Sequence, residues 1–498
     1  MSGPWVDYDT EVSYDEMLAA DGTPRAGCHD VAARLRARGD EVFERQRAGE
    51  AAIRSMGVTF SLSGPAAAGA GGGGTIDRSW PVDLIPRIIS HQEWHEVSDG
   101  LIQRLRALNR FIDDCYGDRE VLGDGVVPAH LIDESPNYRS ECRGVTVRDG
   151  VWAHICGTDL VRDGAGTFRV LEDNLRIPSG VSYMLENRQV SKRVFADLFR
   201  DLDIIPVEGY VDRLGGTLRG LSPRNIDDPI VVVLTPGIFN SAYYEHAYLA
   251  ARIGAQLVEG SDLVVEDKVV YMRTVGGPVR VDVIYRRVDD EFLDPTVFRP
   301  DSVLGVPGLI GAWRAGNVAL ANAPGAGVAD DKVVYSYVPD LIEYYLGERP
   351  ILPNVETWRM HDPEQRAHVL TDLSKWVCKP ANEAGGKGVT IGSQATEEEL
   401  ADVRRQIEAD PRNWIAQPIL ELSTAPTVVG SDLSPAIAPR HVDLRPFILS
   451  GRYPYVTAGG LTRVALREGS LVVNSSQGGG SKDTWIVDPT TPIADLRT

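Results

Sequence analysis

The chain has 498 residues, of which 43% are hydrophobic and 24% are charged, and its formal net charge is −20. This length predicts two to four domains with large buried cores. The acidic balance excludes long nucleic acids as partners, because phosphate backbones need a cationic surface. A nucleotide partner stays open, because a few Lys, Arg and metal ions can neutralise its phosphates locally.

The absence of membrane and secretion signals predicts a cytoplasmic protein. No run of about 18 apolar residues is present, so we expect no membrane-spanning helix and no membrane partner. The opening "MSGPWVDYDTEVSYDEML" lacks the basic-then-apolar order of a signal peptide. The five cysteines are scattered without a C-x-x-C pair, which predicts reduced core residues rather than disulfides or a zinc site.

Residues 1–130 are predicted to be mainly helical. "HDVAARLRARGDEVFERQRAGEAAIRSM" repeats its apolar residues at roughly helical spacing, and residues 92–118 form an amphipathic helix that ends at Gly117. The Gly/Ala stretch at 64–74 predicts a flexible loop. A phosphate-binding role for these glycines is disfavoured, because no strand precedes them and no Lys-Ser/Thr follows.

Residues 131–225 change to a strand pattern, in which a hairpin is predicted around Gly164 and Ala165. Positions equidistant from the turn face one another in such a hairpin. Pairing of the two strands therefore places Asp159 opposite Val170.

One face of this hairpin is predicted to carry metal ligands. Because side chains alternate along a strand, Asp159, Val170, Glu172 and Asn174 fall on one face and Asp173 on the other. Two carboxylates and an amide oxygen are hard ligands that suit Mg²⁺ beside a substrate phosphate. The alternative is a polar strand end that is merely solvated.

Residues 226–330 are predicted to form a small parallel α/β domain. "PIVVVLTPG", "SAYYEHAYLAARIG" and "AQLVEG" read as strand, helix and strand, which is a βαβ unit. The first turn lacks the G-x-G-x-x-G of a dinucleotide site, so an oxidoreductase is disfavoured. Tyr243, Glu245 and His246 are candidate substrate contacts; the alternative is a surface helix with one packed aromatic face.

The last third opens with the predicted helix "DKVVYSYVPDLIEYYLG" and then carries two Gly-rich stretches. In "WVCKPANEAGGKGVTIG" a strand ending at Lys379 leads into a loop whose backbone N–H groups can cover phosphates. That loop contains Gly385, Gly386, Lys387 and Gly388. An ordinary hairpin is the alternative here, and a disordered tail is the alternative for the second stretch, "NSSQGGGSKDT".

The strands between these stretches carry polar residues that need partners. In "NWIAQPILEL", Gln417 precedes Pro418, and a proline marks an edge strand or a hinge. Asp443 and Arg445 share one face of the next strand, and Arg463 lies in the apolar strand "GGLTRVAL". Because a charge in an apolar strand is costly unless it is paired, the two arginines predict an anion held between them.

Together these residues resemble the ATP-grasp superfamily, whose members activate a carboxylate with ATP and pass it to an amine. The matching positions are Lys332 after an Asp at a helix start, Lys379 before the Gly-rich flap, the hinge strand "IAQPIL", the Asp-x-Arg pair Asp443 and Arg445, the phosphate-facing Arg463, and Asn474 of an Asn-x-x-x-Gly-Gly loop. The family's metal pattern, an Asp on one hairpin strand and Glu-x-Asn on the other, matches Asp159, Glu172 and Asn174.

The order of these motifs differs from that of ordinary ATP-grasp proteins, in which the metal hairpin follows the flap. Here it precedes both lysines, as in the circularly permuted ATP-grasp proteins (type 2) related to the glutathionylspermidine synthase ligase domain. "VLEDNLRIPSGVSYMLENR" and "LTRVALREGSLVVNSSQGGGSKDTW" carry that resemblance. One departure is Gly157, where ordinary ligases often have an Arg two residues before the metal Asp.

The resemblance implies an α/β (α+β) fold of circularly permuted ATP-grasp type. The implied parts are a helical N-terminal region at 1–130, the metal-binding part of the core at 131–225, a pre-ATP-grasp α/β domain at 226–330, and the lysine, flap, hinge and phosphate-binding part at 331–498.

The resemblance also implies an ADP-forming carboxylate-amine ligase that acts through an acyl phosphate. Its cofactors would be ATP and two Mg²⁺ ions, with Mn²⁺ as a substitute, and its partners small-molecule or peptide carboxylates and amines. Lys332 and Lys379 would hold the α- and β-phosphates, Asp443 the ribose, and Arg445 and Arg463 the transferring phosphoryl group. Adenine would lie against the hinge residues Gln417, Pro418, Ile419 and Leu420.

Two other functions fit the same fold. One is a catalytically silent binding or scaffold protein, which is disfavoured because both lysines, both arginines and the metal set are present. The other is a phosphotransferase, which would yield a phosphorylated product instead of an amide. The patterns predict neither the two substrates nor the oligomeric state.

Overall fold

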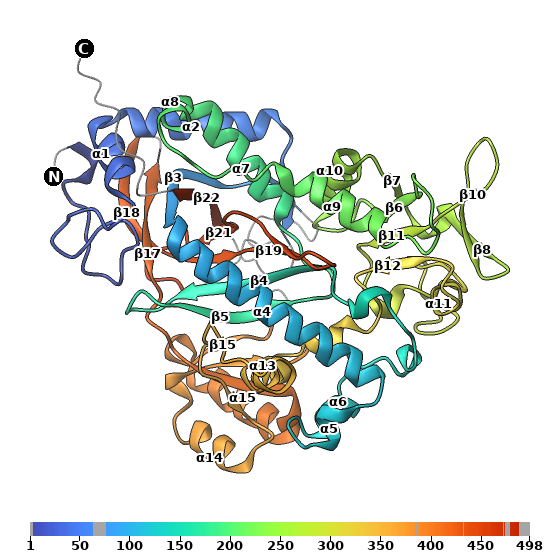
Figure 1. Ribbon diagram of the computed structural model, residues 1–498. Coiled ribbons are helices and arrows are strands. Elements are labelled where there is room, and N and C mark those ends of the chain that lie inside the picture. The colour runs from blue at the N-terminus through green and yellow to red at the C-terminus, as the bar shows by residue number, and fades with distance from the viewer. Residues whose placement is uncertain are drawn as a thin grey trace.

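The computed structural model describes residues 3–62, 76–383, 387–431, 433–471, 473 and 479–487 (Figure 1). Three predictions fall outside these residues: the loop at 64–74, the flap glycines Gly385 and Gly386, and Asn474. The described chain mixes helices with several sheets, as predicted.

Strands from both ends and from the middle of the chain build the largest sheet. Within the described residues it has nine strands, in the order β20-β19-β4-β18-β21-β22-β3, with β5 beside β4 and β17 beside β18. Neighbouring strands are antiparallel except β22 and β3. Their bounds are β3 Val82–Ser90, β4 Ile155–Arg162, β5 Phe168–Asn174, β17 Thr424–Ser431, β18 Ser434–Arg445, β19 Phe447–Leu449, β20 Tyr455–Val456, β21 Leu461–Val464 and β22 Gly480–Val487.

The long predicted helix of the N-terminal region is confirmed as α4, His91–Tyr116. The Ser90 side chain accepts a hydrogen bond from the Glu93 backbone N–H at its start, and Gly117 follows its last residue. Its apolar stripe packs against β3, β20 and β22, so it crosses one face of the large sheet (Figure 1).

The rest of the N-terminal region is less helical than predicted. Its described helices include α1, His29–Ala37, and α2, Glu41–Ser55, whereas the described residues before α1 form loops and one 3₁₀ turn. The hairpin of β1, Thr59–Leu62, and β2, Ile76–Ser79, then leads to β3. The apolar residues of α2 pack against β3 and against α7, Val181–Val194.

The predicted βαβ unit is confirmed. β6, Val231–Leu234, α10, Tyr243–Ile253, and β7, Gln256–Val258, begin a four-stranded parallel sheet of order β12-β11-β6-β7. Its other strands are β11, Val283–Arg286, and β12, Ala319–Ala321. A three-stranded antiparallel sheet of β8 Leu263–Glu266, β9 Val269–Met272 and β10 Val279–Arg280 projects beside it (Figure 1).

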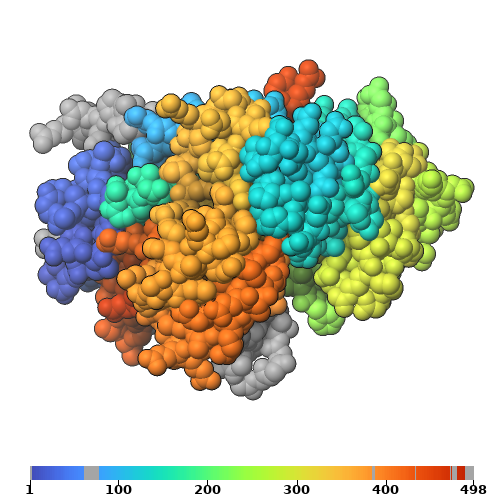
Figure 2. All heavy atoms as spheres, turned by 90° about the horizontal axis from the view of Figure 1, so that it is seen from below, coloured from blue at the N-terminus to red at the C-terminus, as the bar shows by residue number. Residues whose placement is uncertain are grey.

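A smaller antiparallel sheet, β13-β16-β14-β15, packs its own apolar core with α14 and α15. Its elements are β13 Trp358–Arg359, α14 Pro363–Thr371, β14 Trp376–Pro380, β15 Thr390–Ile391, α15 Glu397–Ala409 and β16 Trp414–Pro418. In Figure 2 this part of the chain forms an orange lobe beside the segment that carries α5, Glu120–Gly123, and α6, Ala129–Asp133.

The predicted helix at the start of the last third is two helices, α12, Lys332–Tyr335, and α13, Val338–Leu346. Pro339 lies in the first turn of α13, where its missing N–H costs nothing, but it cannot continue a helix from α12.

Among the described residues, the remaining helices are α8 Ala196–Asp201, α9 Gly209–Gly220 and α11 Leu309–Arg314.

The predictions about the cysteines and about membrane-spanning helices can be compared with the described residues. All five cysteines are buried and free, as predicted. In the parts of the chain that the structure describes, no helix is both long and apolar enough to cross a membrane.

Candidate functional site

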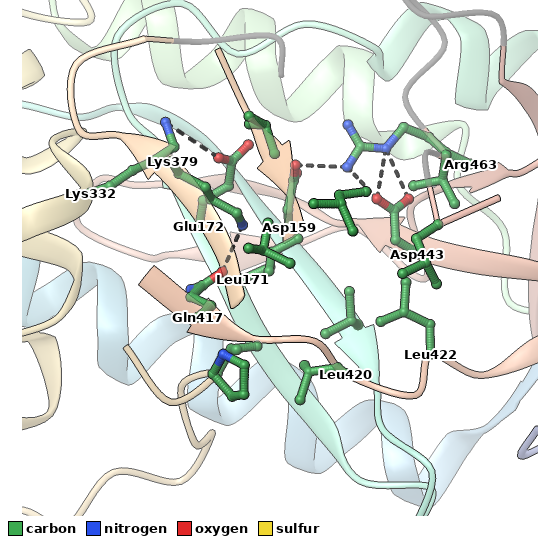
Figure 3. Close-up of a pocket in the computed structure, with 18 of the residues that line it drawn as sticks. Asp159, Leu171, Glu172, Lys332, Lys379, Gln417, Leu420, Leu422, Asp443 and Arg463 are labelled. Atoms are coloured by element: carbon green, nitrogen blue, oxygen red, sulfur yellow. Dashed lines mark hydrogen bonds and ion pairs between the residues drawn. The ribbon is translucent and has the colours of Figure 1, made fainter. Parts of the chain in front are cut away.

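A cavity of about 210 Å³ lies between the large sheet and the smaller sheet (Figure 3). β4, β5, β18 and β21 of the large sheet line one side, and β14, β15 and β16 of the smaller sheet line the other. One end carries Asp159, Glu172, Lys332, Lys379 and Arg463. Leu420 and Leu422 lie at the other end (Figure 3), and the further apolar lining residues are Val161, Leu171, Val355, Val377, Val389, Ile391, Leu471 and Val473.

The hairpin that carries Asp159 and Glu172 has a different register from the predicted one. Asp159 pairs with Glu172, and Val170 pairs with Leu160, because a β-bulge at Leu171 shifts the strands. Val170 therefore lies on the opposite face from Asp159, and the predicted pairing was wrong. The bulge aims Leu171 as well as Glu172 into the cavity.

Asp159 is held between two arginines. Arg445 Nη2 donates to its Oδ2 at 2.7 Å and Arg463 Nη2 donates to the same oxygen at 2.8 Å, while Arg445 Nε donates to Oδ1. Burial opposes ionisation of Asp159, but the two guanidinium groups hold its pKa well below the usual range. The anion that the sequence predicted between these arginines is thus the protein's own carboxylate.

Asp443 faces Arg463 directly across β18 and β21. Arg463 Nε donates to both carboxylate oxygens of Asp443, at 2.9 and 3.0 Å, and its Nη2 also donates to Oδ2. Burial raises the pKa of Asp443, an effect that Arg463 counters. Asp443 lines the cavity, but its observed contact positions Arg463 rather than leaving both oxygens free for a ribose.

Glu172 lies beside Asp159 and forms two longer ion pairs. Its oxygens are 3.7 Å from Lys332 Nζ and 3.8 Å from Arg445 Nη2. Burial and the neighbouring charge of Asp159 raise its pKa. Two carboxylates in such proximity repel each other, and a divalent cation relieves that repulsion.

The chemistry of these side chains fits Mg²⁺. Asp159, Glu172 and Asn174 share one face of the hairpin, as predicted, and all three carry hard oxygens. The buried Nδ2 atom of Asn174 has no hydrogen-bond partner among the described residues, which leaves its amide free to turn its oxygen toward an ion. In the described parts of the chain no third Asp, Glu, His or Cys joins the two carboxylates.

The two predicted phosphate-binding lysines reach the charged end from different elements. Lys332 begins α12 after Asp331, whose side chain accepts from the Val333 backbone N–H. Lys379, near the end of β14, donates to Gln417 Oε1 at 2.7 Å. Burial lowers the pKa of Lys379 to about 8.

The predicted flap and hinge residues lie partly along the cavity. Lys387, Gln417, Pro418 and Leu420 line the cavity, whereas Ile419 does not. Gly388 has a φ of +68°, and a Cβ there would lie 2.8 Å from Pro380 Cγ, so this turn requires glycine. The Gln417 amide also donates to Thr357 Oγ1 at 3.0 Å, a partner the sequence did not reveal.

Tyr243, Glu245 and His246 do not line the cavity. Glu245 is fully buried, where it accepts from the backbone N–H groups of Gly180 and Ser182 and from Arg287. His246 is also buried, and burial lowers its pKa to about 2. Glu245 therefore joins α10 to the loop after β5, and His246 contacts Thr235, so these two side chains are buried rather than exposed on the helix surface.

A comparison with protein families identifies the fold that holds this cavity. The family model for circularly permuted ATP-grasp type 2 proteins matches residues 86–465. The chain belongs to this family. The permuted ATP-grasp order explains why the hairpin with Asp159 precedes the lysines in sequence but faces them across the cavity.

Comparisons of this chain with individual proteins agree with the family assignment. An uncharacterised protein of Synechocystis sp. strain PCC 6803 is 50% identical over 97% of this chain and 99% of its own length. A Frankia casuarinae protein named "Putative glutamate--cysteine ligase 2-2" is 44% identical over 95% of this chain, which spans 53% of that relative. A glutathione synthetase-like effector of Globodera pallida shares the fold, with a TM-score of 0.56 and 12% identity over 90% of this chain and 97% of that chain.

The departure at Gly157 has a structural counterpart in this ATP-grasp site. A Cβ on Gly157 would lie 3.4 Å from Cδ of Arg445, so the arginine chain lies directly above the glycine. Arg445 also donates to the Ser179 backbone carbonyl at 3.4 Å. The guanidinium group beside Asp159 is thus supplied from β18 instead of from β4.

Proposed function

We propose that the protein is an ATP-dependent ligase that joins a carboxylate to an amine, releasing ADP and phosphate. The observation that carries this proposal is the polarity of the cavity between the two sheets. Its apolar end suits an adenine ring, and its charged end combines two lysines and an arginine with a pair of carboxylates. That combination is what phosphoryl transfer requires, because charge must be neutralised around the transferred group.

Lys332 and Lys379 would hold the phosphates of ATP at the charged end. The Lys379 ammonium donates to Gln417 in the structure, so the hinge strand positions it before the nucleotide binds. Lys387 lies on the flap side of the cavity, where the adjoining backbone N–H groups would cover the phosphates.

Asp159, Glu172 and Asn174 would hold Mg²⁺ there. Bound Mg²⁺ would neutralise the charge of the phosphates and polarise them toward attack. The three side chains come from one hairpin, so the register set by the bulge at Leu171 decides whether they meet on one face.

The reaction we infer has two steps. A substrate carboxylate oxygen attacks the γ-phosphorus of ATP, forming a new P–O bond as the bond to the ADP oxygen breaks. The amine nitrogen then attacks the acyl carbon, the C–O bond to phosphate breaks, and the amine loses a proton. Arg445 and Arg463, already aimed by Asp159 and Asp443, would stabilise the charge that develops in both steps.

The ligase name of the Frankia relative supports the same class of reaction. It does not select glutamate or cysteine for this protein, because the chain spans only about half of that relative. Which carboxylate and which amine react is therefore a question for a substrate screen.

The deciding experiment is ADP release from Mg·ATP, measured against a panel of amino acids, peptides and polyamines, with products identified by mass spectrometry. We expect one carboxylate-amine pair to give an amide with stoichiometric ADP. A phosphorylated product would instead identify a phosphotransferase, and ATP binding without turnover for any pair would identify a binding protein.

The matched variants are Arg463→Lys and Arg193→Lys. Arg463→Lys keeps a cation between Asp159 and Asp443 but loses the forked hydrogen bonds, so we expect turnover to fall by about 10²–10³. Arg193 is exposed on α7 and should tolerate the same change. Equal turnover in both variants would remove Arg463 from the proposed mechanism.

A further inference from the structure

A second cavity, of about 250 Å³, lies beside α4, away from the ATP-grasp cavity. It is bounded by α4, by the turn at residues 148–150 and by the connection from β19 to β20. Its lining residues are Ile102, Leu105, Arg106, Asn109, Arg110, Asp149, Gly150, Val151, Ser450, Gly451, Arg452 and Pro454. None of them lines the first cavity.

The second cavity is on the opposite face of the large sheet from the proposed ATP site. Arg104 of α4 forms an ion pair with Asp173, whose side chain faces away from Glu172. The cavity-lining residues of α4, from Ile102 to Arg110, lie on either side of Arg104 in the sequence. A ligand in this cavity therefore could not be a part of the nucleotide in the first one.

Three arginines from two separate elements line this cavity, although the whole chain carries a net charge of −20. Arg106 lies 3.9 Å from Glu348, beyond hydrogen-bond distance. Arg110 donates to the Tyr345 backbone carbonyl and so keeps further N–H groups free. Across the described residues, no carboxylate lies within 4.0 Å of a guanidinium nitrogen of Arg110 or Arg452. Asp149 is the single acidic residue of the lining.

The inner wall adds neutral donors and apolar surface. The Asn109 Oδ1 atom accepts from the backbone N–H groups of Trp152 and Ala153, which fixes the orientation of the amide. Its Nδ2 donates to the Leu105 backbone carbonyl at 3.2 Å and lies 3.4 Å from both the Ala153 carbonyl and Ser450 Oγ. Both side chains are mostly buried, whereas Ile102, Leu105 and Val151 offer carbon surface beside them.

We propose that this cavity binds a small organic anion through its carboxylate or phosphate group. Guanidinium groups bind both kinds of oxyanion through paired N–H donors. The apolar wall would cover a short carbon skeleton. The three guanidinium groups form a local positive patch on a chain of net negative charge, and such a patch attracts anions.

The test is calorimetric titration with glutarate and, separately, inorganic phosphate, at constant ionic strength. The Lys332→Gln/Lys379→Gln variant removes anion binding in the first cavity, and Arg106→Ala/Arg452→Ala removes it in the second. We expect the lysine variant to retain binding of at least one probe, and the arginine variant to lose at least about tenfold in affinity for it. The probe that binds identifies the oxyanion.

The control is Arg193→Ala, which removes an exposed arginine elsewhere and should bind like the wild type. Arg106 and Arg452 are exposed, so their double variant should unfold at the wild-type temperature in the same buffer. The proposal is overturned if neither probe binds, if the arginine variant binds as tightly as the wild type, or if only the lysine variant loses binding.

Discussion

At the scale of single residues, the charged end of the ATP-grasp cavity is organised before any ligand arrives. Asp443 aims Arg463, and Arg463 and Arg445 together hold Asp159. Donors that are already oriented need no reorganisation when charge develops on a substrate, which is the physical basis of electrostatic catalysis. Glu172 is held less closely, because its ion pairs with Lys332 and Arg445 are 3.7 and 3.8 Å long.

Glu172→Gln should therefore weaken Mg²⁺-dependent ATP binding several-fold, because the variant loses the carboxylate that repels Asp159 and attracts a cation. Calorimetric titration of ATP with and without Mg²⁺ measures this effect. Glu134 is exposed, so the control variant Glu134→Gln should bind ATP as the wild type does. An unchanged Mg²⁺ dependence in Glu172→Gln would favour a merely solvated strand end.

Lys379 predicts a pH dependence of ATP affinity. Burial lowers its pKa to about 8 from the usual 10.5, so the free protein carries this charge below pH 8 and loses it above. ATP affinity should accordingly fall as the pH rises from 7 to 9, because the ammonium attracts the phosphates only when it is protonated. ATP titrations at several pH values check this. The ATP affinity of Lys379→Met should be lower than that of the wild type and independent of pH over that range. If ATP affinity falls with pH equally in the wild type and in Lys379→Met, a group other than Lys379 causes the pH dependence.

At the scale of elements, one hairpin serves two purposes because its residues alternate between faces. Glu172 points into the cavity, while Asp173 is buried on the other face and pairs with Arg104 of α4 through Oδ2 contacts of 2.7 and 2.8 Å. The sequence predicted the opposite directions of these two side chains. It did not predict the partner of Asp173, because Arg104 is 69 residues away in the chain.

Asp173→Asn should consequently lower stability without weakening Mg²⁺-dependent ATP binding. Loss of one partner from a buried ion pair costs about 3–5 kcal/mol, because the remaining charge stays desolvated. Urea unfolding measures the change, and ATP titration below the transition tests the site. A stable variant that binds ATP poorly would reverse the roles assigned to the two faces.

At the scale of the whole molecule, the ATP-grasp cavity joins two separately packed cores. The smaller sheet has its own apolar cluster around Met360, Val369, Cys378 and Ile407. The large sheet supplies Asp159, Glu172 and Arg463 from the other side. The boundaries predicted at residues 130, 225 and 330 stay predictions, although β3 shows that the N-terminal region contributes a strand to the large sheet.

ATP bound between these cores should slow backbone hydrogen exchange in β14 and β15, because the nucleotide would contact both sheets and oppose their separation. Exchange measured by mass spectrometry, with and without Mg·ATP, checks this. The strands β6 and β11 of the parallel sheet provide the internal control. Equal exchange in β14 and β15 in both conditions would place the nucleotide elsewhere.

The sequence alone determined the family and predicted the residues of the proposed site, because motifs such as Glu-x-Asn and the strand with Arg463 are local and survive a change in motif order. It also determined α4 and the βαβ unit, whose periodicity is local. Only the tertiary structure decided the bulge at Leu171, the capture of Asp159 by two arginines and the burial of Glu245. These depend on which distant strands become neighbours, and no local pattern specifies that.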